Sequence, residues 1–139
     1  MKTMSRRRIT LALVLLGSAL ATGACHDPAG PELDQPFQIG VGQTVTVDAV
    51  TLRFLEVSQD SRCPRGVTCI WAGDAVVRLR ALLASDSSDI ELHANGAAGP
   101  ASFAFRGYQL ELVSLAPDAV ANTPIPASGY SATLRLRKP

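Results

Sequence analysis

The chain has 139 residues, of which 47% are hydrophobic and 18% charged, a size that suits a single domain. Its formal net charge is +1, but four of the thirteen basic residues lie within the first eight positions, so the chain beyond residue 24 carries nine basic and twelve acidic residues. A mildly acidic domain lacks the basic surface that DNA or RNA binding requires, which excludes nucleic acid as a partner.

The first 24 residues have the pattern of a signal peptide for export. Three arginines at positions 6–8 precede an uncharged, mostly aliphatic run of thirteen residues at 9–21. A permanent membrane-spanning helix needs roughly 20 such residues. We therefore predict that residues 1–24 are a cleaved signal that uses the general secretory route. A retained N-terminal membrane anchor is the alternative.

Cys25 follows this signal and is the expected site of lipid attachment. The preceding Thr22-Gly23-Ala24 resembles a bacterial lipobox, although Thr22 stands where that motif prefers a larger aliphatic residue. Cys25 is also the odd one of three cysteines, and an unpaired thiol in an exported protein needs an explanation. Residues 25–36 are rich in proline and are predicted to be a flexible tether. The expected location is the bacterial cell envelope, with the membrane as partner through the lipid; cleavage after Ala21 would give a secreted protein.

From residue 37 onward, apolar and polar residues alternate with a period of two, which is typical of half-buried strands. In the clearest case, Tyr130, Ala132, Leu134 and Leu136 alternate with polar residues. Further strands are predicted at residues 44–47, 51–57, 75–84, 90–94, 102–105 and 108–113, with turns at 47–49, 85–89, 95–100 and 106–107. This pattern predicts an all-β domain over residues 37–139, a two-sheet antiparallel sandwich (immunoglobulin-like) or a small barrel of seven to eight strands.

Two segments depart from simple alternation. Leu52 and Phe54 share one face of their segment, whereas Leu55 and Val57 share the other. A β-bulge near Phe54-Leu55, or burial of both faces, would account for this pattern. The connection at residues 116–129 is long and contains three prolines, so we expect it to cross from one sheet to the other.

The strongest local feature is a pair of cysteines separated by five residues. Cys63 and Cys69 are expected to form a disulfide, because they are the only partners left once the third cysteine carries lipid. Pro64 and Gly66 favour a turn between them. We expect this short ring to hold two strands together, with Trp71 packed beside it.

Redox chemistry, metal binding and recognition are the alternative roles for the cysteine pair. A redox dithiol favours two intervening residues rather than five. A zinc site needs four ligands, and only two histidines could join the cysteines, one of them His26 in the tether. A blue-copper site usually also needs a methionine, and the chain has none beyond residue 4. No metal and no cofactor are therefore expected. A rigid loop with Arg65 near its tip could instead inhibit a protease, since rigid loops lose less entropy on binding. The candidate recognition loop comprises Arg62, Pro64, Arg65, Gly66 and Trp71.

Charged residues flank the cysteine pair. Asp60, Arg62 and Asp74 could form an ion pair that orients the loop, or be solvated turn residues. His93 is expected to be exposed on the polar face of its strand. No Gly-x-Ser-x-Gly motif is present, and seven aromatic residues are few for the walls of a large cleft. The sequence therefore predicts no catalytic residues and no enzymatic activity.

Residues 60–64, Asp-Ser-Arg-Cys-Pro, followed by Cys-Ile-Trp-Ala-Gly at 69–73, resemble the signature of a group of small bacterial secreted or lipid-anchored β proteins. Their final strand often has the pattern Tyr-x-Ala-x-Leu, as at 130–134 here, and the likeness covers about residues 44–138. This resemblance implies a class of protein and no activity. We expect an envelope lipoprotein that serves as a binding or structural module for an unidentified protein or small-molecule ligand. The alternative is a secreted protease inhibitor that presents the loop between Cys63 and Cys69.

Overall fold

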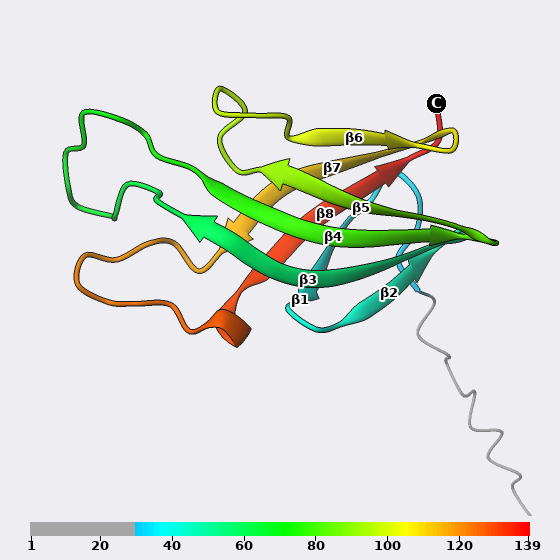
Figure 1. Ribbon diagram of the computed structural model, residues 1–139, viewed down its shortest axis with the longest axis horizontal. Helices are drawn as coiled ribbons and strands as arrows, with labels where there is room; N and C mark the ends of the chain where they lie inside the picture. The colour runs from blue at the N-terminus through cyan, green and yellow to red at the C-terminus, as the bar shows by residue number, and fades with distance from the viewer. Residues whose placement is uncertain (1–29) are drawn as a thin grey trace, which may run out of the picture.

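Alternating apolar residues form strands because side chains two positions apart point to the same side of a sheet. The computed structural model describes residues 30–139, which contain eight strands (Figure 1). In chain order, the elements are β1 (Pro36–Gly40), β2 (Thr44–Val47), β3 (Val50–Asp60), β4 (Ala75–Leu83), β5 (Asp86–His93), β6 (Ser102–Phe105), β7 (Tyr108–Ala116), the short 3₁₀ helix η1 (Ala127–Gly129) and β8 (Ser131–Arg137). The all-β prediction is confirmed.

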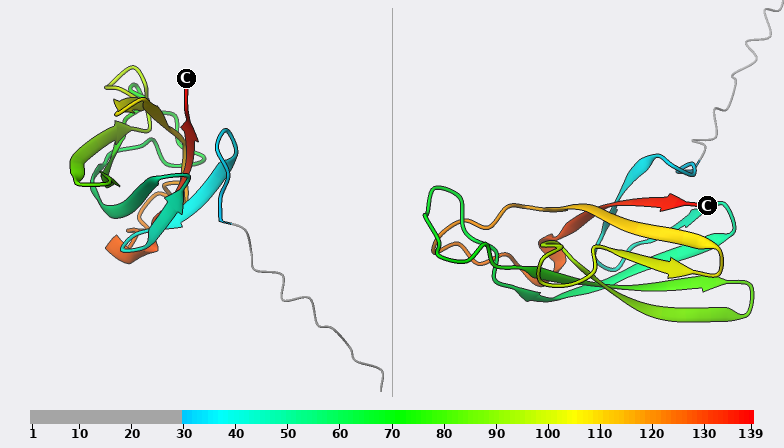
Figure 2. Two further views of the ribbon diagram at one scale, coloured as in Figure 1. Left: turned by 90° about the vertical axis from the view of Figure 1, so that its right-hand side faces the viewer. Right: turned by 90° about the horizontal axis from the view of Figure 1, so that it is seen from above.

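The strands form two antiparallel sheets that pack face to face (Figure 2). One sheet has the order β1-β8-β7-β6, and the other has the order β2-β3-β4-β5. The chain passes between the sheets twice, from β1 to β2 and from β5 to β6, and each remaining connection joins neighbours in one sheet. The architecture is therefore a sandwich and not a closed barrel, with the core between the sheets.

The last strand, β8, follows the clearest sequence pattern. Tyr130, just before the strand, and Ala132, Leu134 and Leu136 within it are all buried in the core. The strand lies between β1 and β7, so both of its edges are paired. The predicted alternation is confirmed.

Strand β3 contains the predicted irregularity. Its register against β4 shifts between Phe54 and Glu56, and a second shift lies between Val57 and Gln59. The extra residue, Leu55, allows Phe54 and Val57 to lie on the same side, where Val57 packs against the core. The bulge is confirmed, and burial of both faces is not needed to explain the sequence pattern.

Two hairpin turns agree with prediction and a third is shorter than predicted. Residues 48–49 connect β2 to β3 and residues 106–107 connect β6 to β7. Asp48, Arg106 and Gly107 have positive φ angles, which two-residue hairpins favour. The turn predicted over residues 85–89 is wrong in extent, because β5 already begins at Asp86 and only residues 84–85 turn. The polar residues that suggested a longer turn belong to an edge strand that meets solvent.

The connection between β7 and β8 does not cross between the sheets, so that prediction is wrong. The two strands are antiparallel neighbours in one sheet, and residues 117–130 leave this sheet and return to it. The long connection instead extends to the loop between β3 and β4. There the carbonyl oxygen of Ala119 accepts the backbone N–H of Arg65 at 2.9 Å.

Strand β1 has no counterpart among the predicted strands. It pairs with β8, and just before it Leu33 packs against the core while the N–H of Asp34 donates to the carbonyl oxygen of Leu136 at 2.9 Å. The predicted signal peptide and the predicted lipid-attachment residue Cys25 lie outside the described residues. Within residues 30–139, no helix is long and apolar enough to cross a membrane.

Candidate functional site

Two long loops meet at one end of the sandwich, which we call the loop end (Figure 1). Residues 61–74 join β3 to β4, and residues 117–130 join β7 to β8. Besides its backbone hydrogen bond to the second loop, Arg65 forms an ion pair with Asp118. The described chain begins and ends at the opposite end of the sandwich (Figure 1).

The predicted disulfide between Cys63 and Cys69 is confirmed. Backbone pairing continues beyond β3 and β4 to the base of the ring, because Ser61 donates to the carbonyl oxygen of Asp74 at 2.7 Å and Cys63 to that of Ala72 at 3.1 Å. The ring therefore sits on a hydrogen-bonded stem and does not join two otherwise separate strands. A covalent ring on a paired stem restricts the conformations open to the loop.

Gly73 makes the close approach of the two sides of this stem possible. Its φ angle is +67°, and a Cβ atom at this position would lie 1.8 Å from the carbonyl oxygen of Ser61. That distance is far inside van der Waals contact, so any side chain at residue 73 would force the stem apart. The glycine that ends the sequence motif thus has a steric role.

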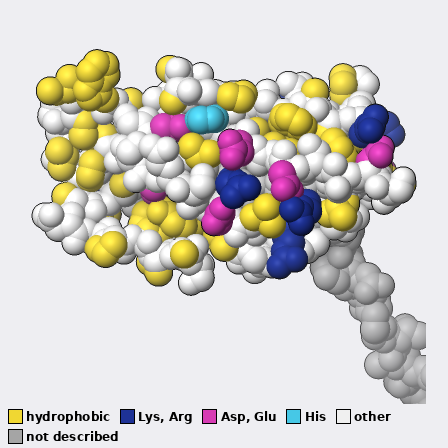
Figure 3. Space-filling view, in the orientation of Figure 1, with side chains coloured by type: hydrophobic (Ala, Val, Ile, Leu, Met, Phe, Trp, Pro, Cys, Tyr) yellow, Lys and Arg dark blue, Asp and Glu magenta, His cyan; other side chains and the backbone are white. Residues whose placement is uncertain are grey.

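Four apolar side chains, which we call the apolar tip, are exposed at the loop end: Val67, Ile70, Trp71 and Val120. Ile70 is 92% exposed and Trp71 81% exposed. Among residues 30–139, six large hydrophobic side chains are exposed, and these four gather at one end, where Figure 3 shows a group of hydrophobic side chains. Trp71 does not pack beside the disulfide, so that prediction is wrong. The hydrogen-bonded stem places Trp71 away from the core, which side chains of the strands already fill.

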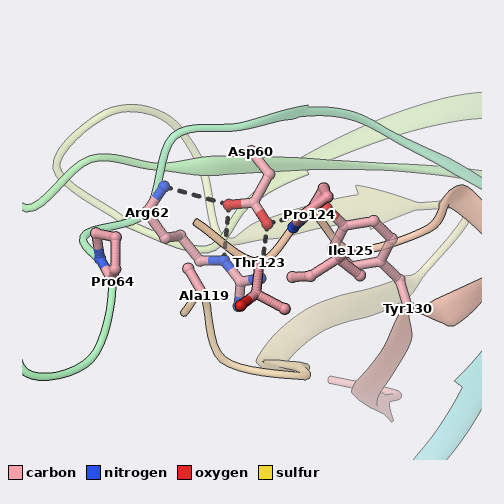
Figure 4. A pocket seen from close by; sticks show the side chains of 8 residues that line it. All are labelled: Asp60, Arg62, Pro64, Ala119, Thr123, Pro124, Ile125 and Tyr130. Carbon is pink, nitrogen blue, oxygen red and sulfur yellow. Dashed lines mark hydrogen bonds and ion pairs between the residues drawn. The ribbon is translucent and has the colours of Figure 1, made fainter. Parts of the chain in front are cut away.

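Asp60 and Arg62 form an ion pair beneath the two loops (Figure 4). The Arg62 guanidinium donates from Nε to Oδ1 at 2.9 Å and from Nη2 to Oδ2 at 2.7 Å, so the pair is bidentate. It also donates to the carbonyl oxygens of Leu115 at 2.8 Å and Pro117 at 2.9 Å, and the Tyr130 hydroxyl donates to Asp60 at 3.1 Å. We call Asp60, Arg62 and Tyr130 the clamp, because they join the two loops to both sheets.

The clamp holds its groups in fixed charge states. Burial opposes the negative charge of Asp60, but the hydrogen bonds and positive charge of Arg62 outweigh it and hold the pKa of the carboxyl below its usual value. The hydrogen bond to Asp60 raises the pKa of Arg62. Burial, and then the hydrogen bond to Asp60, raise the pKa of the Tyr130 hydroxyl. None of the three groups is suited to exchange protons near neutral pH.

A cavity of about 220 Å³ lies between the two loops, with the clamp in its lining (Figure 4). Its apolar lining comes from Pro64 of the disulfide ring and from Ala119, Pro124 and Ile125 of the second loop. Thr123 adds a hydroxyl group. The opposite charges of the clamp compensate one another, so the lining has no net charge.

Asp74 pairs with His93 and not with Arg62. Nδ1 of His93 lies 2.6 Å from Oδ2 of Asp74, whose Oδ1 accepts the backbone N–H of Asn95 at 2.8 Å. His93 is partly buried, so the prediction of an exposed histidine is wrong. This contact ties the stem of the disulfide loop to the end of β5. In the part of the chain that the structure describes, no three His, Cys, Asp or Glu residues are grouped to hold a metal ion.

The five residues of the candidate recognition loop occupy different environments. Arg62 belongs to the clamp, Pro64 lines the cavity, and Gly66 turns the chain with a φ angle of +77°. Arg65 is bonded to the second loop. Of the five, Trp71 alone presents a large apolar surface to solvent.

Sequence reasoning missed Val67, Ile70, Val120 and Tyr130. The signal for Ile70 was its place between a ring cysteine and Trp71, in a segment too short to reach back to the core. Val120 and Tyr130 had no local signal, because their roles depend on contacts with Arg65 and Asp60, which lie more than 50 positions earlier in the sequence. Comparison of this chain with protein-family models, curated proteins and solved structures finds no match.

Proposed function

We propose that this protein is a lipid-anchored binding module of the bacterial cell envelope and that its apolar tip binds a partner protein. The observation that carries the proposal is the exposure of Ile70 and Trp71 on a disulfide-closed loop. Grouped apolar side chains on a protein surface mark interaction sites more often than isolated ones. A loop that is already rigid loses little entropy on binding, and tryptophan is prominent among the residues that dominate protein interfaces.

The position of the apolar tip fits an anchored protein. The described chain begins at Gly30, at the end of the sandwich opposite the loop end (Figure 1). A lipid on Cys25 would attach that far end to the membrane. Strands β4 and β7 have nine residues each and extend about 30 Å, so the apolar tip would point away from the anchoring membrane.

The charges around the apolar tip favour a protein over a lipid surface as the partner. The two loops contain two arginines, of which Arg62 is held in the clamp and Arg65 is paired with Asp118. Peripheral membrane binding commonly combines apolar side chains with Lys or Arg residues that are free to contact anionic headgroups. A compensated ion pair beside apolar side chains is typical of the polar rim of a protein interface.

The bonding of Arg65 argues against the protease-inhibitor alternative. A protease that binds an extended segment uses the backbone hydrogen-bonding groups of that segment and a pocket for its side chain. Here the N–H of Arg65 is bonded to Ala119, and the guanidinium is paired with Asp118. We therefore expect no stoichiometric inhibition of a panel of trypsin-like proteases. Inhibition that Arg65→Ala abolishes would restore the alternative.

Site-specific photocrosslinking in cells of the source bacterium tests the binding proposal. A photoreactive amino acid at position 71 should crosslink to a defined protein, whereas the same amino acid at position 82 should not. Leu82 is a matched control because it is an exposed apolar residue near the far end of β4. The dissociation constant of the captured protein should then rise at least tenfold for Trp71→Ala and stay unchanged for Leu82→Ala. Equal affinity for wild type and both variants would contradict the proposal.

The anchoring part of the proposal is tested at Cys25. Mass spectrometry of the mature protein should find an acylated Cys25 as the N-terminal residue. Cys25→Ser should leave the protein unprocessed or release it from the membrane. A mature chain that begins at Thr22 and carries a free Cys25 thiol would refute lipid anchoring.

A further inference from the structure

The cavity between the two loops and the apolar tip are adjacent parts of one surface. Ala119 lines the cavity, and the next residue, Val120, belongs to the apolar tip. Pro64 lines the cavity from the disulfide ring, which also carries Val67. A partner that covers the apolar tip therefore lies beside residues that line the cavity.

The lining of the cavity selects against charged ligands. The two carboxylate oxygens of Asp60 accept four hydrogen bonds, three from Arg62 and one from Tyr130, so little capacity remains for a cationic ligand. An anion would find a guanidinium whose positive charge that carboxylate already compensates. The remaining lining is mostly proline and aliphatic side chains, which offer a charged ligand no opposite charge.

We infer that this cavity receives one uncharged aliphatic or aromatic side chain of the partner protein. Its volume of about 220 Å³ is below the roughly 300–1,000 Å³ of pockets for drug-sized ligands but suits a group the size of a side chain. Four of the five N–H donors of the Arg62 guanidinium are used within residues 30–139, and the fifth can donate to a backbone carbonyl beside the inserted side chain. The inference rests on the proposed function, because the partner is the one that the apolar tip binds.

Titration with amino-acid derivatives, followed by two-dimensional NMR, tests the inference. The protein is purified without residues 1–24, which leaves the complete sandwich. N-acetyl-leucinamide and N-acetyl-phenylalaninamide should shift the backbone amide signals of Thr123 and Ile125 in a saturable manner. The expected dissociation constant is on the order of 1–10 mM, as befits probes of about 12–15 non-hydrogen atoms. N-acetyl-lysinamide and N-acetyl-aspartic acid amide should bind at least tenfold more weakly.

Variants of the second loop supply the control. Ala119→Leu and Thr123→Leu place a larger side chain in the cavity lining and should each weaken binding of the uncharged probes at least tenfold. Ala121→Leu makes a similar change on the same loop at an exposed residue outside the lining and should leave binding unchanged. Thermal unfolding of all three variants checks that each remains folded. Two cavity-filling variants are used so that the test can still be completed if one of them does not fold.

The outcomes separate the two proposals. If neither uncharged probe shifts these signals, if the charged probes bind as well, or if both cavity-filling variants bind like wild type, the cavity inference is overturned. Binding of the captured partner would still depend on Trp71 in that case. If the probes bind as expected but the partner binds Trp71→Ala as well as wild type, the cavity inference stands and the proposed function of the apolar tip fails.

Discussion

Arg62→Met is the substitution that most directly tests the clamp. Methionine keeps an unbranched apolar side chain but removes the positive charge and every donor. The side chains of Arg62 and Asp60 are 15% and 13% exposed. The variant therefore leaves a nearly buried carboxylate without its cation, and it leaves the carbonyl oxygens of Leu115 and Pro117 without these donors.

The expected loss in the free energy of unfolding is about 2–4 kcal/mol. Removal of one partner from a buried ion pair costs about 3–5 kcal/mol, and each unmade hydrogen bond adds about 1 kcal/mol. Two effects reduce this cost. Asp60 still accepts from the Tyr130 hydroxyl and from the backbone N–H of residue 62, and water reaches part of both side chains. The loss is large against a total stability of about 5–15 kcal/mol.

Arg80→Met is a matched control. Arg80 forms a bidentate pair with Asp89 at 2.6 and 2.9 Å, so its geometry is close to that of the clamp. Both side chains are 49% exposed, however, and exposed ion pairs contribute little to stability. This variant should therefore lose much less stability than Arg62→Met. The two pairs differ in their burial and in the further hydrogen bonds that the pair in the clamp makes with Leu115, Pro117 and Tyr130.

Urea denaturation followed by far-ultraviolet circular dichroism measures these effects. The single tryptophan, Trp71, is exposed in the folded protein, so its fluorescence is a poor probe of unfolding. The double variant Asp60→Asn with Arg62→Met should recover part of the loss, because no unpaired charge remains. A midpoint for Arg62→Met equal to wild type, or an equal loss for Arg80→Met, would refute the reasoning.

Three further predictions concern the core, the disulfide and pH. Leu134→Ala should cost about 2–5 kcal/mol because this side chain is fully buried, whereas Arg135→Ala, on the outer face, should cost less than about 1 kcal/mol. Similar urea midpoints for the two variants would contradict this contrast. Replacement of Cys63 and Cys69 by serine should cost about 2 kcal/mol, and full stability of the double variant would show that the ring is dispensable for folding. The lowered pKa of Asp60 means that its contribution to stability is present above about pH 4 and is lost as pH falls through the folded-state pKa, so Asp60→Asn should flatten the acid side of the stability profile. An unchanged slope in urea melts from pH 5 to pH 2 would argue against a stabilising role for this carboxylate.

The features that the sequence predicted well depend on residues close together in the chain. The alternation around Leu134 predicted β8, and the broken alternation at Leu55 predicted the bulge in β3. Both follow from the geometry of a strand, in which successive side chains point to opposite faces. Cys63 and Cys69 could be paired because only two candidates remained and the chain between them is short.

By itself, then, the sequence determined the all-β class, most of the strands and the short disulfide ring, since each depends on neighbouring residues. The tertiary structure decided which strands are neighbours, and it placed β7 beside β8 where a crossing had been predicted. It also decided that Trp71 is exposed and that Arg62 is held in the clamp by residues more than 50 positions away. The composition of a loop shows neither what lies across from it nor whether the core has room for its apolar side chains. The packing of the two sheets settles both.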